Sequence, residues 1–153
     1  MNAPANNATH WSPDDERTLL DTIDAWVEKS VRPIAREYDS EDKYPHALVE
    51  QMKELGLFGA TISPQYGGLG LSAGIYAKIG TRVAAAWMAP TGIFNSHLIM
   101  AAAIERCGTQ AQKEKYLPRM ASGELRGGLG LTEPDAGTDL QAIRCVARRD
   151  GAR

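Results

Sequence analysis

Apolar residues recur at helical spacing along most of the chain, and each run is bounded by residues that start or stop a helix. The first run follows Ser12, which forms a capping-box pattern with Asp15, and Pro33 is expected to end or kink this helix. A second run ends at Gly56, because glycine readily adopts the left-handed conformation that closes a helix. Ser72 is the expected cap of a third helix. The first half of the chain is therefore predicted to be helical.

Two further helices are expected in the second half. Pro90 separates the third helix from a fourth, residues 91–107, which is apolar on nearly every side. A helix of that composition is typical of the centre of a bundle, where neighbouring helices cover all of its faces. Thr109 and Gln112 form another capping box and begin a fifth helix. The pattern thus predicts a mainly α fold, an antiparallel helical bundle.

The period of the pattern changes from helical to alternating in residues 125–132. Leucines there lie on one face of an extended chain, as expected of a β-strand. Gly128 and Gly130 share the opposite face, which would let a ligand or another backbone approach closely.

A second alternating run, residues 143–148, leads into Asp150-Gly151, a dipeptide typical of hairpin turns. No return strand follows this turn in the sequence, so we expect a β-domain that is cut off near its start. This divides the chain into a disordered N-terminal tail at residues 1–11, a helical domain at 12–124 and the first strands of a truncated β-domain at 125–153.

Composition and charge narrow the possible functions. With 43% hydrophobic residues the chain can build a core, and 17 Lys and Arg against 19 Asp and Glu argue against a nucleic-acid binder. The charges are unevenly spread, because residues 1–60 carry 12 acidic and 6 basic side chains whereas residues 61–153 carry 7 and 11. A basic second half would help to hold a phosphate-rich ligand.

Cysteine and histidine placement gives no sign of a metal site. Cys107 and Cys145 supply no metal-ligand pair, and we expect them to be small apolar fillers in a reduced compartment. His10, His46 and His97 have no partners at metal-ligand spacing. His97 falls on the predicted central helix, where a hydrogen-bonded core or pocket-lining histidine is the expected reading.

No targeting or membrane segment is expected. The opening residues, MNAPANNATH, lack the basic start and apolar run of a secretory signal. The longest apolar stretches are shorter than the ~20 residues that cross a bilayer. We therefore expect a cytoplasmic protein without a membrane span.

The segment LTEPDAGTDL, residues 131–140, is the strongest candidate for a binding site. Pro134 and Gly137 make the chain turn between Thr132 and Thr138. Backbone amides in such a turn can converge on an anion, and the hydroxyls add donors and acceptors. These groups suit a ligand with phosphates and a heteroatom-rich ring edge. On spacing alone, an ordinary acidic turn between two domains is the favoured interpretation of the segment.

GLGLTEPDAGTD resembles the TEP-x-A-G-[ST]-D signature at the helix-to-β boundary of the acyl-CoA dehydrogenase family. SPDDERTLLDTIDAWVEKSVRPIAREYD, FGATISPQYGGLGLS and GTQAQKEKYLPRMASGE resemble that family in the same order. The resemblance implies a subunit in which an N-terminal α-domain, a β-domain and a C-terminal helical bundle enclose FAD. It also implies removal of a proton from the α-carbon of an acyl-CoA and hydride transfer from the β-carbon to flavin N5. Electron-transfer flavoprotein is the implied acceptor, and the full-length protein would be a homo-oligomer.

Matching the signature implies roles for individual residues. Leu129 and Leu131 would offer backbone groups to the isoalloxazine edge, and Thr132 would place its hydroxyl and amide near N1 and O2. Gly137 and Thr138 would contact the pyrophosphate or the pantetheine of the substrate.

The resemblance also implies an acyl cavity and a base. Ile93, Phe94 and Ser96 of the fourth helix would line the cavity that holds the acyl chain. The base of the family is a carboxylate in its C-terminal domain, and no residue here matches it, because the positions of Glu133 and Asp139 are structural in the family. We therefore expect no catalytic residue in this chain, and no activity from it alone. Two alternatives stay open: a non-catalytic helical interaction module, and an acyl-CoA oxidase or flavin monooxygenase of the same fold.

Overall fold

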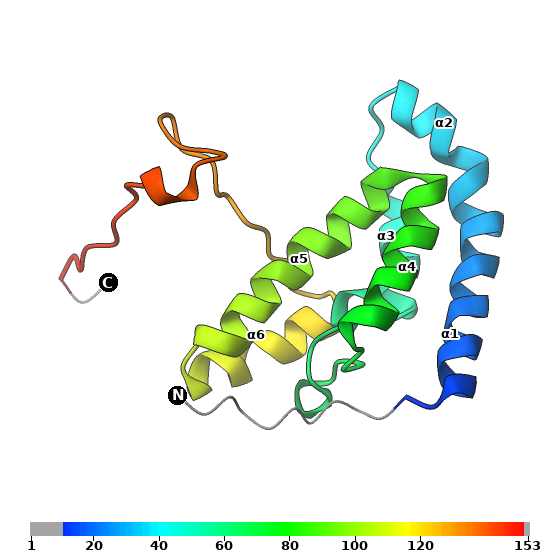
Figure 1. Ribbon diagram of the computed structural model, residues 1–153, viewed down its shortest axis with the longest axis horizontal. Coiled ribbons are helices and arrows are strands. Elements are labelled where there is room, and N and C mark those ends of the chain that lie inside the picture. The colour runs from blue at the N-terminus through cyan, green and yellow to red at the C-terminus, as the bar shows by residue number, and fades with distance from the viewer. Residues whose placement is uncertain (1–10, 152–153) are drawn as a thin grey trace.

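The computed structural model describes residues 11–151, which form an assembly of α-helices followed by an extended segment (Figure 1). The helices are α1 (Pro13–Trp26), α2 (Arg32–Ser40), α3 (His46–Glu54), α4 (Ala73–Ala86), α5 (Met88–Cys107) and α6 (Gln110–Ala121), with a π-helical turn, Val27–Val31, between α1 and α2. The predicted N-terminal tail lies outside the described residues except for Trp11. The Trp11 indole donates a hydrogen bond to the carbonyl of Leu69 at 3.1 Å.

The helix boundaries predicted from capping residues are confirmed. Ser12 accepts a hydrogen bond from the amide of Asp15 at 3.1 Å, and the reciprocal contact completes the capping box. Ser72 caps α4, and Thr109 starts α6 with the second capping box. Gly56 follows α3 with φ +70°, a left-handed conformation that a β-carbon would disfavour. Local sequence chemistry therefore sets where these helices begin and end.

Pro33 does not end the first helix, and Pro90 lies inside the fourth helix instead of before it. The first helix does not stop at Pro33: its hydrogen-bonding pattern widens to a π-helical turn at Val27–Val31, and α2 then continues to Ser40. The π turn accommodates a proline that has no amide proton to donate. The break before the fourth helix lies at Trp87, whose backbone is extended, and Pro90 falls in the first turn of α5. A missing amide donor costs nothing there.

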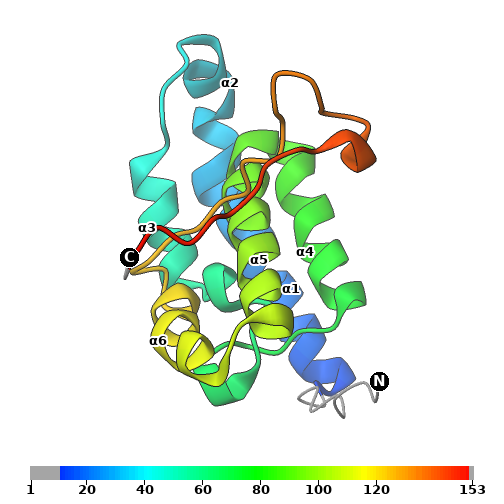
Figure 2. The same ribbon diagram turned by 90° about the vertical axis from the view of Figure 1, so that its left-hand side faces the viewer.

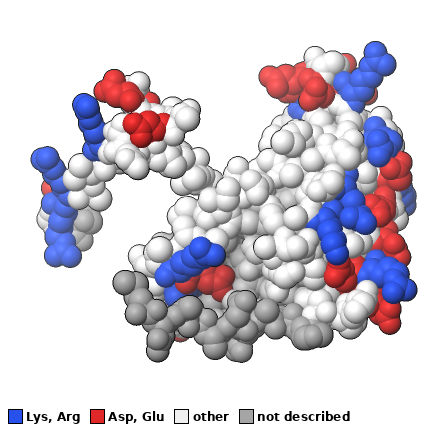
Figure 3. All heavy atoms as spheres, viewed as in Figure 1, with Lys and Arg blue, Asp and Glu red and all other residues white. Residues whose placement is uncertain are grey.

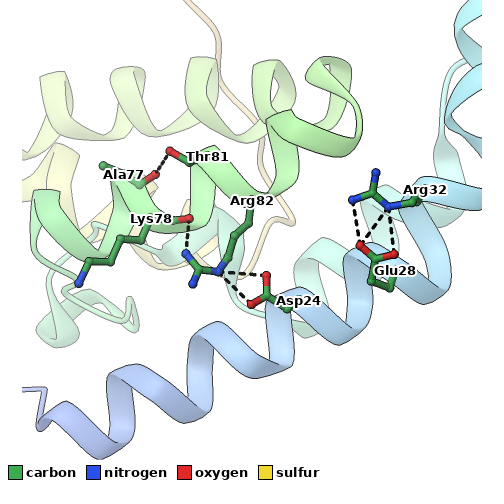
Figure 4. Close-up of polar contacts among 7 residues, drawn as sticks. All are labelled: Asp24, Glu28, Arg32, Ala77, Lys78, Thr81 and Arg82. Carbon is green, nitrogen blue, oxygen red and sulfur yellow. Dashed lines mark hydrogen bonds and ion pairs between the residues drawn. The ribbon is translucent and has the colours of Figure 1, made fainter.

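Helix α5 lies between α4 and α6 and runs antiparallel to both (Figures 1 and 2). Helix α1 packs along the other side of α4, where Arg82 pairs with Asp24 at 3.0 Å (Figure 4) and Lys78 pairs with Glu16. These pairs are exposed, so they orient the two helices more than they stabilise them. Stability comes from the fully buried side chains, which include Ile23, Leu48, Met52, Phe58, Ile79, Val83, Phe94 and Leu117.

The apolar composition of helix α5 predicts that neighbouring helices cover all of its faces. This prediction is wrong. Phe94, Leu98 and Ala101 are buried against the other helices, whereas Ile99 is 45% and Met88 70% exposed. Apolar composition predicts that a face will be covered, but it does not say by which element. Among the described residues, no element covers the outer face of α5.

The two predicted strands are absent from the described residues. Residues 125–132 and 143–148 form no β-ladder with any part of residues 11–151. Within that range, the only β-type contact is an isolated bridge between Glu133 and Ala136. A strand needs a neighbour for its amides and carbonyls, and the described part of the chain supplies none. Figure 1 shows the segment after α6 extending away from the helices on the side of α5. The alternating residue pattern therefore lies on extended segments that have no neighbouring strand among the described residues.

The described residues contain no metal cluster and no membrane helix. No three His, Cys, Asp or Glu side chains among residues 11–151 lie close enough together to hold a metal ion. In the same range, no helix combines the length and apolarity that a bilayer crossing requires. Cys107 and Cys145 are free thiols, and both are exposed, so the expectation that they fill the core is wrong. Their small size is compatible with either environment, and only packing decides between them.

Candidate functional site

The chain is held firmly where it leaves the helices. Gly123 has φ +74°, and a β-carbon there would lie 2.8 Å from Lys53 Cγ and 2.9 Å from the Phe58 ring, so only glycine fits. The guanidinium of Arg126 donates to the hydroxyl of Tyr44 at 2.7 Å, which links the exit to the loop between α2 and α3. The path of residues 123–127 is therefore fixed by the helical domain.

His97 of α5 makes the innermost contact of this exit. Its Nδ1 accepts a hydrogen bond from the amide of Gly127 at 3.2 Å, and its Nε2 lies 3.1 Å from the carbonyls of both Phe58 and Met120. These partners assign the ring proton to Nε2 and leave Nδ1 as the acceptor. The side chain is 1% exposed. Burial lowers the pKa of His97 below its usual value; the two carbonyls act against this, and the charge of Arg126 adds to it.

Beyond Gly127 the chain offers unpaired polar groups on an open surface. Leu129 and Leu131 are 53% and 39% exposed, and neither makes a backbone hydrogen bond within the described residues. A β-carbon on Gly128 or Gly130 would meet nothing within 4 Å. This stretch of backbone is therefore sterically open, and the approach of a ligand to it stays a prediction.

The following turn brings two of the predicted site residues together. The amide of Glu133 donates to the carbonyl of Ala136 at 2.7 Å, which reverses the chain. As a result, a β-carbon on Gly137 would lie 3.6 Å from Thr132 Cγ2. The Thr132 and Thr138 hydroxyls are exposed and make no hydrogen bond to the described residues. The turn therefore presents free hydroxyls beside a glycine.

The two carboxylates of the signature accept hydrogen bonds from backbone amides of the same segment. Glu133 accepts hydrogen bonds from the amides of Arg144 and Cys145, both at 2.9 Å. Asp139 accepts one from the amide of Gln141 at 3.1 Å and so caps a short 3₁₀ turn. In this arrangement both carboxylates hold backbone amides of the extended segment.

The three predicted acyl-cavity residues of α5 do not converge. Phe94 is fully buried and packs edge-to-face on Tyr76, with ring centroids 6.1 Å apart. Ile93 is half-buried in a hollow of about 250 Å³ that Trp87 also lines, whereas Ser96 is exposed. Their joint role in an acyl cavity stays a prediction.

Two polar residues of α5 were missed in the sequence. Thr91 Oγ1 is buried without a partner, and Asn95 Oδ1 accepts from the hydroxyl of Tyr76 at 2.7 Å. Thr91, Asn95 and Ser96 interrupt the apolar first half of α5, which is the signal that could have singled them out. Of these three residues only Ser96 is exposed, whereas the Thr91 hydroxyl is buried and Asn95 is bonded to Tyr76.

A second hollow lies at the other end of α5. This groove of about 540 Å³ is lined by Met100, Ala103, Ile104, Cys107, Gly108, Gln112, Tyr116, Met120, Leu125, Arg126 and Gly127. The surface around α5 carries few charges, whereas charged side chains gather along α1 and α2 and on the extended segment (Figure 3). An uncharged surface beside unpaired backbone is typical of a face that another part of a protein covers.

Comparisons with known proteins agree with this geometry. The family described as acyl-CoA dehydrogenase, N-terminal domain, matches residues 13–124. Glutaryl-CoA dehydrogenase of Desulfococcus multivorans is 36% identical over 130 residues, covering 82% of this chain and 33% of that protein.

Two solved structures are similar along nearly the whole chain. One is glutaryl-CoA dehydrogenase from Mycobacterium smegmatis, with a TM-score of 0.82 and 32% identity over 92% of this chain and 36% of that one. The other is described as an electron transferring flavoprotein of Acidaminococcus fermentans, with a TM-score of 0.83 and 29% identity over 94% of this chain and 38% of that one. The chain spans about a third of the length of the relatives it matches. It belongs to the acyl-CoA dehydrogenase family, whose N-terminal helical domain it carries.

Proposed function

We propose that the chain supplies the helical domain and one flavin-contacting segment of an FAD-dependent enzyme that dehydrogenates an acyl-CoA thioester. One observation carries this proposal. The segment from Gly128 to Thr132 is fixed at its start by the helical domain, yet its own polar groups are unpaired and open. Such a segment fits the edge of a planar, heteroatom-rich ring. Proteins with similar sequences include a glutaryl-CoA dehydrogenase and a short-chain acyl-CoA dehydrogenase.

The residues of this segment would bind and orient the cofactor. When bound, FAD supplies the hydride acceptor of the reaction. Backbone groups of Leu129 and Leu131 and the hydroxyl of Thr132 face solvent without competing partners. Fixed dipoles of this kind stabilise negative charge that develops on a ring edge, because they are oriented before the reaction begins. Gly137 and Thr138 would contact the phosphates or the pantetheine.

Helix α5 would contribute to the acyl end of the site. Thr91, Asn95 and Ser96 place polar groups on a mostly apolar helix, and Ile93 adds apolar surface. A helix with this mixture suits an acyl chain that carries a polar thioester.

The chain alone is expected to be inactive. A general base must reach the α-carbon of the substrate, and the two carboxylates of the signature are engaged with backbone amides. In the complete enzyme we expect a homo-oligomer that passes electrons to an electron-transfer flavoprotein. The cytoplasmic location stays a prediction.

A chimera tests this function. The chain is joined to the remaining two thirds of the Desulfococcus multivorans relative, which replaces the matching part of that protein. We expect a folded flavoprotein whose absorbance is bleached anaerobically by an acyl-CoA from a panel of straight, branched and dicarboxylic thioesters. A chimera that folds, as judged by circular dichroism and gel filtration, but holds no flavin while the parent does would contradict the proposal. That outcome would favour a non-catalytic helical module.

A further inference from the structure

His97 connects four separate parts of the chain through one buried ring. It lies on α5, reaches the carbonyl of Phe58 in the turn after α3 and that of Met120 near the end of α6, and receives the amide of Gly127. The Phe58 ring packs edge-to-face on the imidazole, with centroids 5.1 Å apart. The ring is therefore fixed in both position and orientation before it meets Gly127.

Gly127 is the last residue of the exit whose backbone is tied to the helical domain. A β-carbon there would lie 2.9 Å from Met100 Cγ, so the backbone passes directly over α5. From Gly128 to Thr132 the backbone makes no hydrogen bond to any residue in the range 11–151. Because an extended residue advances about 3.3 Å, Leu129 begins only about 7 Å beyond the His97 contact. The position of Gly127 therefore limits where the open segment can start.

The contact requires a neutral imidazole with a free Nδ1 lone pair. Phe94, Leu98 and Ala101, which flank His97 on α5, carry no charge. Phe58 and Met120 face the ring with carbonyls, and Arg126 on the exit segment is the charged group that acts on it. This environment favours the neutral ring, and hence the acceptor that Gly127 needs.

We propose that His97 is the positioning residue of the flavin-edge segment, residues 129–132, and that it acts through the amide of Gly127. This inference rests on the proposed function for the flavin, but the geometry of the contact stands independently of it. A hydrophobic core side chain of similar size would fill the same space and would leave the amide without an acceptor. His97 therefore acts through the direction of its hydrogen bond to Gly127, and an apolar side chain that only fills the space would not perform this role.

Two substitutions separate positioning from packing. In His97→Asn, the Oδ1 atom takes the place of Nδ1 and can accept from Gly127, while the contacts to Phe58 and Met120 are lost. In His97→Gln, the amide group reaches the place of Nε2 and can donate to those carbonyls, while the acceptor for Gly127 is lost. His97→Asn loses two contacts and His97→Gln loses one, so the local effect at Gly127 must be measured relative to unfolding of α5.

Amide hydrogen exchange in the 153-residue chain measures the difference. The exchange rate of the Gly127 amide is compared with that of the Leu98 amide, which reports unfolding of the buried helix. We expect His97→Gln to accelerate exchange of the Gly127 amide about tenfold relative to exchange of the Leu98 amide. It should also increase the backbone mobility of residues 128–132, as measured by ¹⁵N relaxation. His97→Asn should keep the exchange ratio and the backbone mobility close to their wild-type values. Equal ratios of Gly127 to Leu98 exchange in the two variants would overturn the proposal. If His97 only filled space, both substitutions would change the two exchange rates in parallel.

A measurement on the wild type covers the case in which neither variant folds. A scalar coupling across the hydrogen bond between the Gly127 amide nitrogen and His97 Nδ1, with the proton on Nε2, is expected. Absence of the coupling would overturn the proposal directly. These readouts contain no flavin, so they succeed or fail independently of the proposed function. In the flavin-loaded chimera, His97→Gln should lower kcat more than His97→Asn, and equal kcat values would refute the link to the flavin edge.

Discussion

The amide of Gly127 donates a hydrogen bond to Nδ1 of His97 at 3.2 Å, across 30 positions of the sequence. Through this contact a residue of α5 holds the exit segment two residues before the flavin-edge segment, residues 129–132, begins. The same ring holds two carbonyls on its other side, so displacement of the histidine would disturb three neighbouring segments together. The binding segment is open, but its origin is rigid.

The first prediction concerns the pH dependence of stability. Because burial lowers the pKa of His97 in the folded protein, the unfolded chain binds a proton more readily than the folded one. The contribution of the neutral His97 side chain to stability is fully present above the pKa of an unfolded histidine, about 6.5. It is lost progressively as the pH falls below that value, until the folded pKa is reached. Urea denaturation between pH 8 and pH 5 should show this loss, with a slope of at most about 1.4 kcal/mol per pH unit.

The control for this prediction is a second histidine. His97→Gln removes the titrating group, so the pH dependence should flatten although the variant is less stable at pH 8. His46 is exposed at the start of α3, and His46→Gln should retain the wild-type profile. If His97→Gln and the wild type lose stability in parallel between pH 7 and pH 5, the neutral, buried histidine is not the cause.

The second prediction concerns the buried face of α5. Phe94 is fully buried and Ile99 is 45% exposed on the same helix. Phe94→Ala should cost about 3–5 kcal/mol of unfolding free energy, because it leaves a cavity that the neighbouring helices close only in part. Ile99→Ala should change stability by less than about 1 kcal/mol. Chemical denaturation of both variants measures the difference, and comparable losses would mean that the outer face of α5 is covered in solution.

The helices could be predicted because their signals are local. Ser12, Ser72 and Thr109 cap their helices through atoms three residues away, and Gly56 needs only its own backbone freedom. Such contacts form whatever the rest of the chain does, so the pattern of residues suffices to place them.

The strands and the site depend on distant partners, which a pattern does not contain. Residues 125–132 alternate correctly, yet strand formation needs a neighbouring chain. The role of His97 was open for the same reason, since its three polar partners come from residues 58, 120 and 127. The resemblance of the signature identified Thr132 and Gly137, and the structure brings these two residues together.

The third prediction is that Glu133 folds the segment and takes no part in chemistry. Its carboxylate accepts from the amides of Arg144 and Cys145, so Glu133→Gln, which presents an NH₂ group to one of them, should accelerate exchange of both amides. Asp135→Asn, an exposed change in the same turn, is the matched control and should leave these amides unaffected. The chain mixed with FAD should show no bleaching by any acyl-CoA, with or without the substitution. Bleaching by the wild type that Glu133→Gln abolishes would identify Glu133 as a base.

The last prediction separates the two threonines in the flavin-loaded chimera. The Thr132 hydroxyl is free, and it lies beside Gly137 in the turn. We expect it to bond the pyrimidine edge of the flavin, where reduction adds negative charge, so the bond should strengthen as the reaction proceeds. Thr132→Val keeps the shape and removes the donor. It should make the flavin potential more negative and lower kcat about ten- to a hundredfold, equivalent to about 1.4–2.7 kcal/mol.

Thr138→Val is the matched comparison, because it removes the same group from the other side of the turn. Phosphates and pantetheine keep their charge during the reaction, so the loss of this hydroxyl should weaken binding of cofactor or substrate and leave kcat near the wild-type value. Potentiometric titration and steady-state kinetics on both variants measure the separation. If Thr132→Val changes neither the potential nor kcat, residues 131–140 are a structural turn, and the contact to the flavin must come from elsewhere in the protein.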